Sequence, residues 1–274
     1  MVKKNLFIKL YGLLTIFLDV ALVFGLKLCN SFADIYIPII LLPLIFIGFF
    51  VFHVVSTILL SLLVSAKKQY DKPNKFYRFW VDETVQYVFN LLMVKVKVNG
   101  VEFLPTDRRF LLVSNHISGF DPIVCVKALK KYNIVYIAKP EILKIPVVNA
   151  FLNVCCFMAI DRENARNAMK TIRRATDLVK NDIVSVGVYP EGTRSRTGEL
   201  LEFKDGVFYT AKKAPCPVVV MTVKGTNKFW KCVFSCKNFI EINVLKVIEP
   251  EEFESKATHE ISELAREIML DNLK

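Results

Sequence analysis

The chain has 274 residues, 53% of them hydrophobic, and a net charge of +11. This length suits one domain of about 200 residues with an appendage. The charge fits nucleic acid, an anionic membrane surface or an anionic substrate. The apolar N-terminus favours the membrane, and the absence of arginine-rich and Gly/Ser tracts argues against a nucleic-acid partner.

Two apolar runs open the chain. Residues 10–26 contain one charged residue, Asp19, and residues 35–64 contain no Asp, Glu, Lys or Arg. A helix needs about 20 apolar residues to cross a bilayer. We therefore predict a membrane-embedded helical hairpin over residues 1–66. We expect the polar residues inside the runs, Asp19 and His53, to be satisfied by partners or to lie at the membrane interface.

Basic residues gather outside both ends of the hairpin, and Lys9 and Lys27 lie at the two ends of the first apolar run, where they can snorkel. Lys3 and Lys4 precede the first run, Lys67 and further lysines follow the second, and residues 30–34 between the runs contain none. The positive-inside rule predicts a cell-membrane protein with both ends of the hairpin, and the following domain, on the cytoplasmic face. Two helices that dip into one leaflet are the alternative.

Residues 67–93 form a juxtamembrane unit in this interpretation. Residues 67–75 are polar and contain a proline, which is typical of a linker. Residues 76–93 have an aromatic-rich amphipathic pattern, which predicts a helix at the level of the lipid headgroups.

The pattern changes from residue 94 onward to short β-branched runs that alternate with helical segments. Such alternation predicts an α/β domain over residues 94–274, with a mixed, largely parallel sheet flanked by helices. We expect strands at 94–98, 109–114, 134–138, 155–160, 183–189, 217–223 and 240–247, and helices at 122–131, 163–180 and, in two pieces, 250–273. The strict alternation in residues 94–98 is typical of an edge strand.

The cysteines indicate a reducing compartment. There are seven, an odd number, and no pair has the C-x-x-C spacing. We expect reduced, mostly buried thiols in a protein that faces the cytosol. Cys232 and Cys236 with His259 are a poor zinc candidate, and no metal site is predicted.

A histidine and an aspartate follow the predicted strand 109–114. Asp121-Pro122 reads as a helix start, with Asp as the N-cap and Pro at the first position. His116 thus lies at the carboxyl end of a strand with a carboxylate folded back towards it, as a general base requires. The plainer alternative is a helix cap beside a hydrogen-bonded loop histidine.

Loops 115–121, 161–166 and 190–198 each follow a predicted strand, so parallel strands would bring them to one rim. Arg162 in the second loop and Lys204 beyond the third add positive charge there.

The third loop contains groups suited to a phosphate. Gly192 would let backbone amides approach a ligand, Thr193 adds a hydroxyl, and Arg194 offers a bidentate guanidinium. Glu191 could hold an arginine in place or bind a substrate hydroxyl. A surface turn with ordinary ion pairs is the alternative.

The order Asn115-His116-x4-Asp121, then Pro190-Glu191-Gly192-Thr193-Arg194-Ser195, resembles the glycerophospholipid acyltransferases, in particular the bacterial 1-acyl-sn-glycerol-3-phosphate type. Weaker blocks at 138–146, 160–162, 203–206 and 216–220 fall in the expected order.

The resemblance implies a reaction. His116, oriented by Asp121, would deprotonate the sn-2 hydroxyl of lysophosphatidate, which attacks the thioester of acyl-CoA or acyl-carrier protein to give phosphatidate for phospholipid synthesis. It implies no metal and no bound cofactor. The glycerol phosphate would be held by Glu191, Gly192, Thr193 and Arg194, with Arg162, Lys139 and Lys204 as helpers.

Other functions stay open. The acceptor could be another lysophospholipid or glycerol 3-phosphate. The chain could be a non-catalytic membrane lipid-binding protein, or a hydrolase, although no G-x-S-x-G elbow is present.

Overall fold

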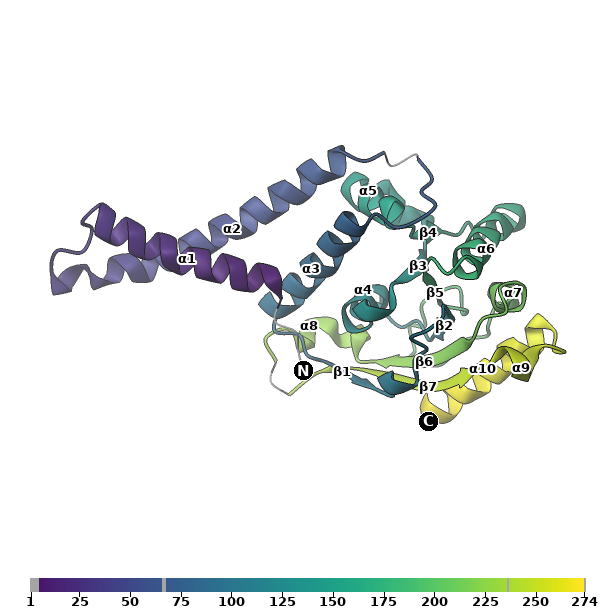
Figure 1. Cartoon of the computed structure of the whole chain (residues 1–274). Coiled ribbons are helices and arrows are strands. Elements are labelled where there is room, and N and C mark those ends of the chain that lie inside the picture. The colour runs from purple at the N-terminus through teal and green to yellow at the C-terminus, as the bar shows by residue number, and fades with distance from the viewer. Residues whose placement is uncertain (1–4, 66–67, 236, 274) are drawn as a thin grey trace.

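The computed structural model describes residues 5–65, 68–235 and 237–273. Its centre is a seven-stranded sheet in which β6 and β7 are antiparallel and all other neighbours are parallel (Figure 1). The strands, in spatial order, are β1 (Val96–Asn99), β7 (Ile240–Ile248), β6 (Val218–Lys224), β2 (Leu111–Ser114), β5 (Ser185–Val188), β3 (Ile134–Ala138) and β4 (Met158–Ala159). The predicted mixed, largely parallel sheet is confirmed, and β1 is an edge strand as expected.

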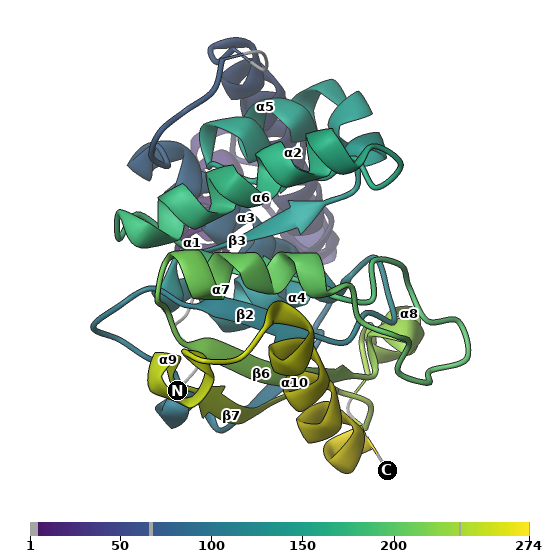
Figure 2. The same ribbon diagram turned by 90° about the vertical axis from the view of Figure 1, so that its right-hand side faces the viewer.

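Helices cover both faces of this sheet. Figure 2 shows α6, α7 and α10 in front of the strands, and Figure 1 shows α3 and α4 on the opposite side. The central strands β2 and β5 are buried along their whole length, because a sheet covered on both faces needs apolar residues on both sides. The helices of the domain are α4 (Asp121–Ala128), α5 (Pro146–Val154), α6 (Ala165–Lys180), α7 (Tyr209–Lys213), α8 (Phe229–Cys232), α9 (Pro250–Phe253) and α10 (Thr258–Leu273).

The predicted strand over residues 155–160 is reduced to two residues. The run 155–160 was apolar enough for a strand, but β4 spans only Met158–Ala159. Helix α5, which the apolar pattern did not reveal, begins at Pro146 and continues to Val154. Cys156 then turns the chain with a φ of 64°, so only the last residues of the run are free to pair with β3.

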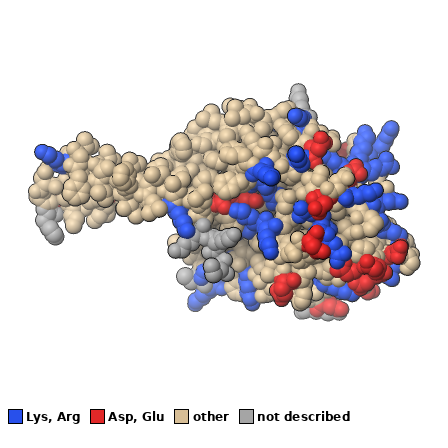
Figure 3. Space-filling view, viewed as in Figure 1, with Lys and Arg blue, Asp and Glu red and all other residues tan. Residues whose placement is uncertain are grey.

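The N-terminal hairpin projects away from the α/β domain (Figure 1). Helices α1 (Leu6–Gly25) and α2 (Tyr36–Leu62) are long and apolar enough to cross a membrane. Figure 3 shows their surface as almost free of charged residues. An apolar surface of this size is consistent with membrane association. Lys3, Lys4 and Lys67 lie outside the described residues, so the orientation of the hairpin stays a prediction.

Helix α3 (Lys75–Leu91) connects the hairpin to the sheet layer. Its N-cap is Asn74, whose side chain accepts the backbone N–H groups of Phe76 and Tyr77. Towards the hairpin, Trp80 Nε1 donates to Thr57 Oγ1 over 3.0 Å. Towards the sheet, Arg78 Nη1 donates to the carbonyl oxygen of Ile134 over 3.0 Å. Because α3 packs on both parts, the division at residues 66/67 and 93/94 stays a prediction.

His53 and Asp19, the two polar residues predicted to need partners inside the apolar runs, differ in their hydrogen bonding. His53 is buried and both its ring nitrogens are bonded, Nδ1 to the Tyr11 hydroxyl and Nε2 to Thr84 Oγ1. The expectation of a satisfied histidine is therefore confirmed. Asp19 is buried too, but its Oδ1 has no hydrogen-bond partner among the described residues. That oxygen is therefore not satisfied by a partner, and a position of Asp19 at the membrane interface stays a prediction.

Candidate active site

The loops after β2 and β5 meet at one edge of the sheet. The strands are parallel neighbours, with Leu112 opposite Gly187. The backbone N–H of His116 donates to Glu191 Oε1 over 2.6 Å. In return, the N–H of Ser195 donates to the carbonyl oxygen of His116 over 2.8 Å. Both backbone groups of His116 are thus tied to the loop 190–198, so the two loops converge as predicted.

His116 and Asp121 form a hydrogen-bonded pair. His116 Nδ1 lies 2.8 Å from Asp121 Oδ2. The same oxygen accepts the backbone N–H groups of Ile117 and Ser118, each over 2.9 Å. Because a carboxylate surrounded by donors can only accept, His116 Nδ1 carries its hydrogen and Nε2 is left with a lone pair. Among the residues described, Nε2 has no hydrogen-bond partner.

Asp121 does not cap its helix as the sequence suggested. Phe120 occupies the N-cap position of α4, and no side chain caps it. The Asp121 carboxylate, which is fully buried, turns back to the preceding loop instead. A helix cap and a carboxylate that bonds the preceding loop have the same local sequence here, so only the fold distinguishes them.

Two further side chains fix this loop. Asn115, which belongs to the sequence motif, accepts from the N–H of Val223 over 2.7 Å and donates to its carbonyl oxygen over 3.0 Å. Thr226 was missed by the sequence analysis, and its hydroxyl donates to Asp121 Oδ1. Thr226 follows Gly225, which has a φ of 88°. A glycine directly after a buried strand was the one available signal for this turn.

Tyr189 supports the His116 imidazole from one side. Its ring stacks on that of His116, with the centroids 4.2 Å apart and the planes 19° apart. The ring of Tyr136 in turn stacks on that of Tyr189, with the centroids 5.7 Å apart. Burial raises the pKa of both tyrosine hydroxyls well above the usual value, and it raises the pKa of the neighbouring Cys125 thiol to about 12. The wall behind His116 is therefore uncharged at neutral pH.

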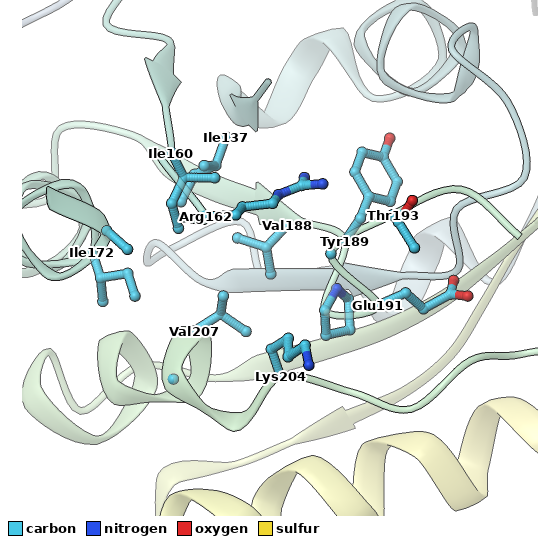
Figure 4. Close-up of a pocket in the computed structure, with 14 residues that line it drawn as sticks. Ile137, Ile160, Arg162, Ile172, Val188, Tyr189, Glu191, Thr193, Lys204 and Val207 are labelled. Carbon is cyan, nitrogen blue, oxygen red and sulfur yellow. The ribbon is translucent and has the colours of Figure 1, made fainter. Parts of the chain in front are cut away.

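Glu191 joins the loops together. Oε1 accepts from His116, and Oε2 accepts the N–H of Leu201 over 3.0 Å. Burial raises the pKa of Glu191 above its ordinary value, against the opposing effect of these two bonds. Figure 4 shows its carboxylate directed away from Arg162. Its geometry thus fits a positioning residue, whereas the sequence suggested a partner for an arginine or a substrate hydroxyl.

Gly192 has a structural reason to be glycine. Its φ is 72°, a conformation that side chains disfavour. Its N–H donates to the carbonyl oxygen of Tyr189 over 3.0 Å. That amide closes the turn, and the approach of other backbone amides to a ligand at Gly192 stays a prediction.

A cavity of about 350 Å³ lies beside the turn 189–193 (Figure 4). Its polar lining residues are Arg162, Glu191, Thr193 and Lys204, and partial burial lowers the pKa of Arg162. Tyr189 lines the cavity as well as stacking on His116. The apolar part is formed by Ile137, Ile160, Ala168, Ile172, Val188 and Val207.

The other two predicted basic residues, Arg194 and Lys139, do not line this cavity. Arg194 is exposed, and its Nη1 is 3.6 Å from the point where a Cβ on Gly119 would stand, so it borders the His116 loop. Lys139 is exposed and does not line the cavity.

Within the part of the chain that the structure describes, no three His, Cys, Asp or Glu residues are grouped to hold a metal. Cys236, part of the poor zinc candidate, lies outside that part.

The acyltransferase family model matches residues 95–224. The 1-acyl-sn-glycerol-3-phosphate acyltransferase of Limnanthes douglasii is 32% identical over 138 residues, which are 50% of this chain and 48% of that protein. The enzyme of the same name from Borreliella burgdorferi is 29% identical over 158 residues, 57% of this chain and 62% of that protein. The match therefore spans about half to three-fifths of these curated relatives.

One solved structure covers nearly the whole chain. It is the 1-acyl-sn-glycerophosphate (LPA) acyltransferase PlsC from Thermotoga maritima, with a TM-score of 0.60 and 21% sequence identity. The similarity covers 97% of this chain and 95% of that one, and it includes the hairpin, so the two proteins share a fold. Residues 95–224 of this chain match the acyltransferase family.

Proposed function

We propose that the protein transfers an acyl chain from a thioester donor to the sn-2 hydroxyl of 1-acyl-glycerol-3-phosphate, which gives phosphatidate. The observation that carries this proposal is the His116–Asp121 pair, in which one ring nitrogen is held and the other is left to take a proton. The names of the relatives support lysophosphatidate as the acceptor.

In the proposed reaction, His116 Nε2 removes the proton of the acceptor hydroxyl as its oxygen attacks the thioester carbonyl carbon. The tetrahedral intermediate collapses, the carbon–sulfur bond breaks, and the imidazolium returns the proton to the leaving thiolate. Asp121 stabilises the imidazolium and fixes its tautomer. The acceptor oxygen is the nucleophile, so no acyl-enzyme forms. No metal or bound cofactor takes part in this scheme.

The substrates divide between the polar and apolar parts of the site. Arg194, beside the His116 loop, would bind the acceptor phosphate through its bidentate guanidinium. Arg162, Thr193 and Lys204 would add to the field at the cavity, with Lys139 as a peripheral helper. The aliphatic wall of the cavity suits an acyl chain. The donor would be acyl-CoA or acyl-carrier protein.

The membrane segment would bring this site to its lipid substrate. In this proposal residues 1–66 anchor the protein in the membrane, and residues 67–93 join this anchor to the following domain. Residues 94–274 form the acyltransferase domain on the cytoplasmic face of the cell membrane.

An assay of the purified protein tests the proposal. Lysophosphatidate, glycerol 3-phosphate and neutral lysolipids would each be offered with acyl-CoA and with acyl-carrier protein. We expect phosphatidate to be the main product. Equal use of a neutral lysolipid would contradict the phosphate-binding role of Arg194. Release of free fatty acid without any acceptor would instead indicate a hydrolase, and no turnover with any pair would leave a lipid-binding protein.

A further inference from the structure

Exposed aromatic residues gather in one turn of the α/β domain. We call residues 229–235 and 237–239, which include α8, the aromatic turn. Trp230 is 70% exposed, Phe234 is 65% exposed and Phe239 is 49% exposed. Large aromatic side chains rarely face water together in this way, and such a surface usually binds a partner or a membrane.

The aromatic turn is positively charged. Lys228, Lys231 and Lys237 are all exposed, and residues 224–239 contain no Asp or Glu. None of the ion pairs among the described residues involves these three lysines. Aromatic rings interleaved with lysines match the interface of an anionic bilayer, where Trp sits at the headgroups and Lys meets the lipid charge.

Hydrogen bonds hold the aromatic turn in shape. The N–H of Phe234 donates to the carbonyl oxygen of Leu92, at the end of α3, over 2.8 Å. Asn238 Nδ2 donates to the carbonyl oxygen of Lys231 over 2.9 Å. Phe234 has a φ of 52°, an uncommon conformation for a bulky residue. The chain thus holds an exposed phenylalanine in an unfavourable backbone conformation.

Position argues for the membrane as the partner. Figure 1 shows α8 on the side of the α/β domain from which the apolar hairpin projects. The aromatic turn also touches the catalytic loop, because the ring of Phe120, next to Asp121, stacks on Phe229 at 4.0 Å and meets Trp230 edge-on at 5.7 Å. A membrane that contacts this turn would therefore lie beside the His116 loop.

We propose that the aromatic turn is a second membrane contact, which inserts Trp230 and Phe234 among the headgroups of an anionic leaflet and thereby sets the catalytic loop at the lipid surface. This inference relies on the proposed membrane anchoring by the hairpin. The aromatic turn would contact the membrane separately from the hairpin, and anchoring by the hairpin does not depend on this second contact.

Tryptophan fluorescence tests the contact without any turnover. The chain has two tryptophans, Trp80 and Trp230, so Trp80→Phe leaves Trp230 as the reporter. The full chain would be reconstituted in phosphatidylcholine vesicles with and without phosphatidylglycerol. We expect lipids brominated near the headgroup to quench Trp230, and aqueous acrylamide to quench it weakly, in the anionic vesicles. The control places the reporter at the exposed Lys170 of α6. It is Lys170→Trp in a chain that also carries Trp80→Phe and Trp230→Phe.

Removal of the lysines tests the charge. Lys228→Gln, Lys231→Gln and Lys237→Gln together should weaken the bromine quenching in anionic vesicles, with roughly a fivefold change in the docking equilibrium for each lysine. Lys170→Gln, Arg173→Gln and Lys180→Gln on α6 remove the same charge and should change nothing. If acrylamide reached Trp230 as readily as the α6 control, or if both triple variants behaved alike, the proposal would be wrong. Because the readout is not acyl transfer, a failed catalytic assay leaves this test intact.

Discussion

Two buried histidines, His53 and His116, have different surroundings in this protein. Each stacks on an aromatic ring, Trp80 for His53 and Tyr189 for His116. His53 bonds a hydroxyl through each ring nitrogen. His116 bonds one carboxylate through Nδ1, and its Nε2 has no partner among the described residues.

The difference separates a structural histidine from a candidate base. A ring with both nitrogens occupied by neutral hydroxyls is held in place and has no lone pair to offer. A ring held at one nitrogen by a carboxylate is ready to accept a proton at the other. Burial and stacking are the same in the two cases, so neither of them identifies a catalytic residue.

The largest effect is expected for His116→Ala. The variant should lose about 10³-fold or more in acyl transfer, because it removes the proposed general base. Its thermal unfolding in detergent should stay close to that of the parent chain. A rate near that of the parent would reject the role of His116, and with it the comparison drawn above.

Thr226→Val should come next. It removes the hydroxyl that donates to Asp121 Oδ1, and a hydrogen bond to a charged group contributes about 1.5–3 kcal/mol. We expect kcat to fall about tenfold to 100-fold with little change in KM, and Thr226→Ser to restore most of it. Thr222→Val is the matched control, since Thr222, also buried, bonds Asn272 instead. If both valine variants lost activity equally, the effect would be one of general stability.

His53→Leu should leave the rate per folded molecule unchanged and lower stability. The hydroxyls of Tyr11 and Thr84 lose their partner, which costs about 1–3 kcal/mol for a buried polar group. Thermal unfolding, followed together with the rate of the surviving protein, measures both. A loss of rate without a loss of stability would give His53 a role that its contacts do not suggest.

The smallest effect concerns pH. Burial raises the pKa of Glu191, so the folded protein keeps this proton at pH values where the unfolded chain has released it. The contribution of Glu191 to stability is therefore fully present below its unfolded pKa and is lost as pH rises through the raised folded pKa. Glu191→Gln should flatten this fall. Denaturant unfolding at several pH values above about 4.5 would reveal it, and an unchanged slope would contradict it.

The sequence was sufficient for the sheet and for the two loops that meet, because apolar periodicity and the His116–Asp121 spacing are local signals. It did not reveal the partners of these residues. Thr226 is far from Asp121 along the chain, and the two are joined only when β6 lies beside β2. The role of Glu191 was hidden for another reason: it accepts backbone N–H groups, which every residue except proline has.

Gly187 leaves room for the Tyr136 ring in the middle of the sheet. It pairs with both Leu112 and Tyr136 in the middle of the sheet, and a Cβ there would stand 2.4 Å from the Tyr136 ring. That ring backs Tyr189, which in turn backs His116. A methyl group added at Gly187 would displace the Tyr136 ring, and the stacked Tyr189 would carry this displacement to the His116 imidazole, so the alignment of the proposed base depends on the absence of a side chain at position 187.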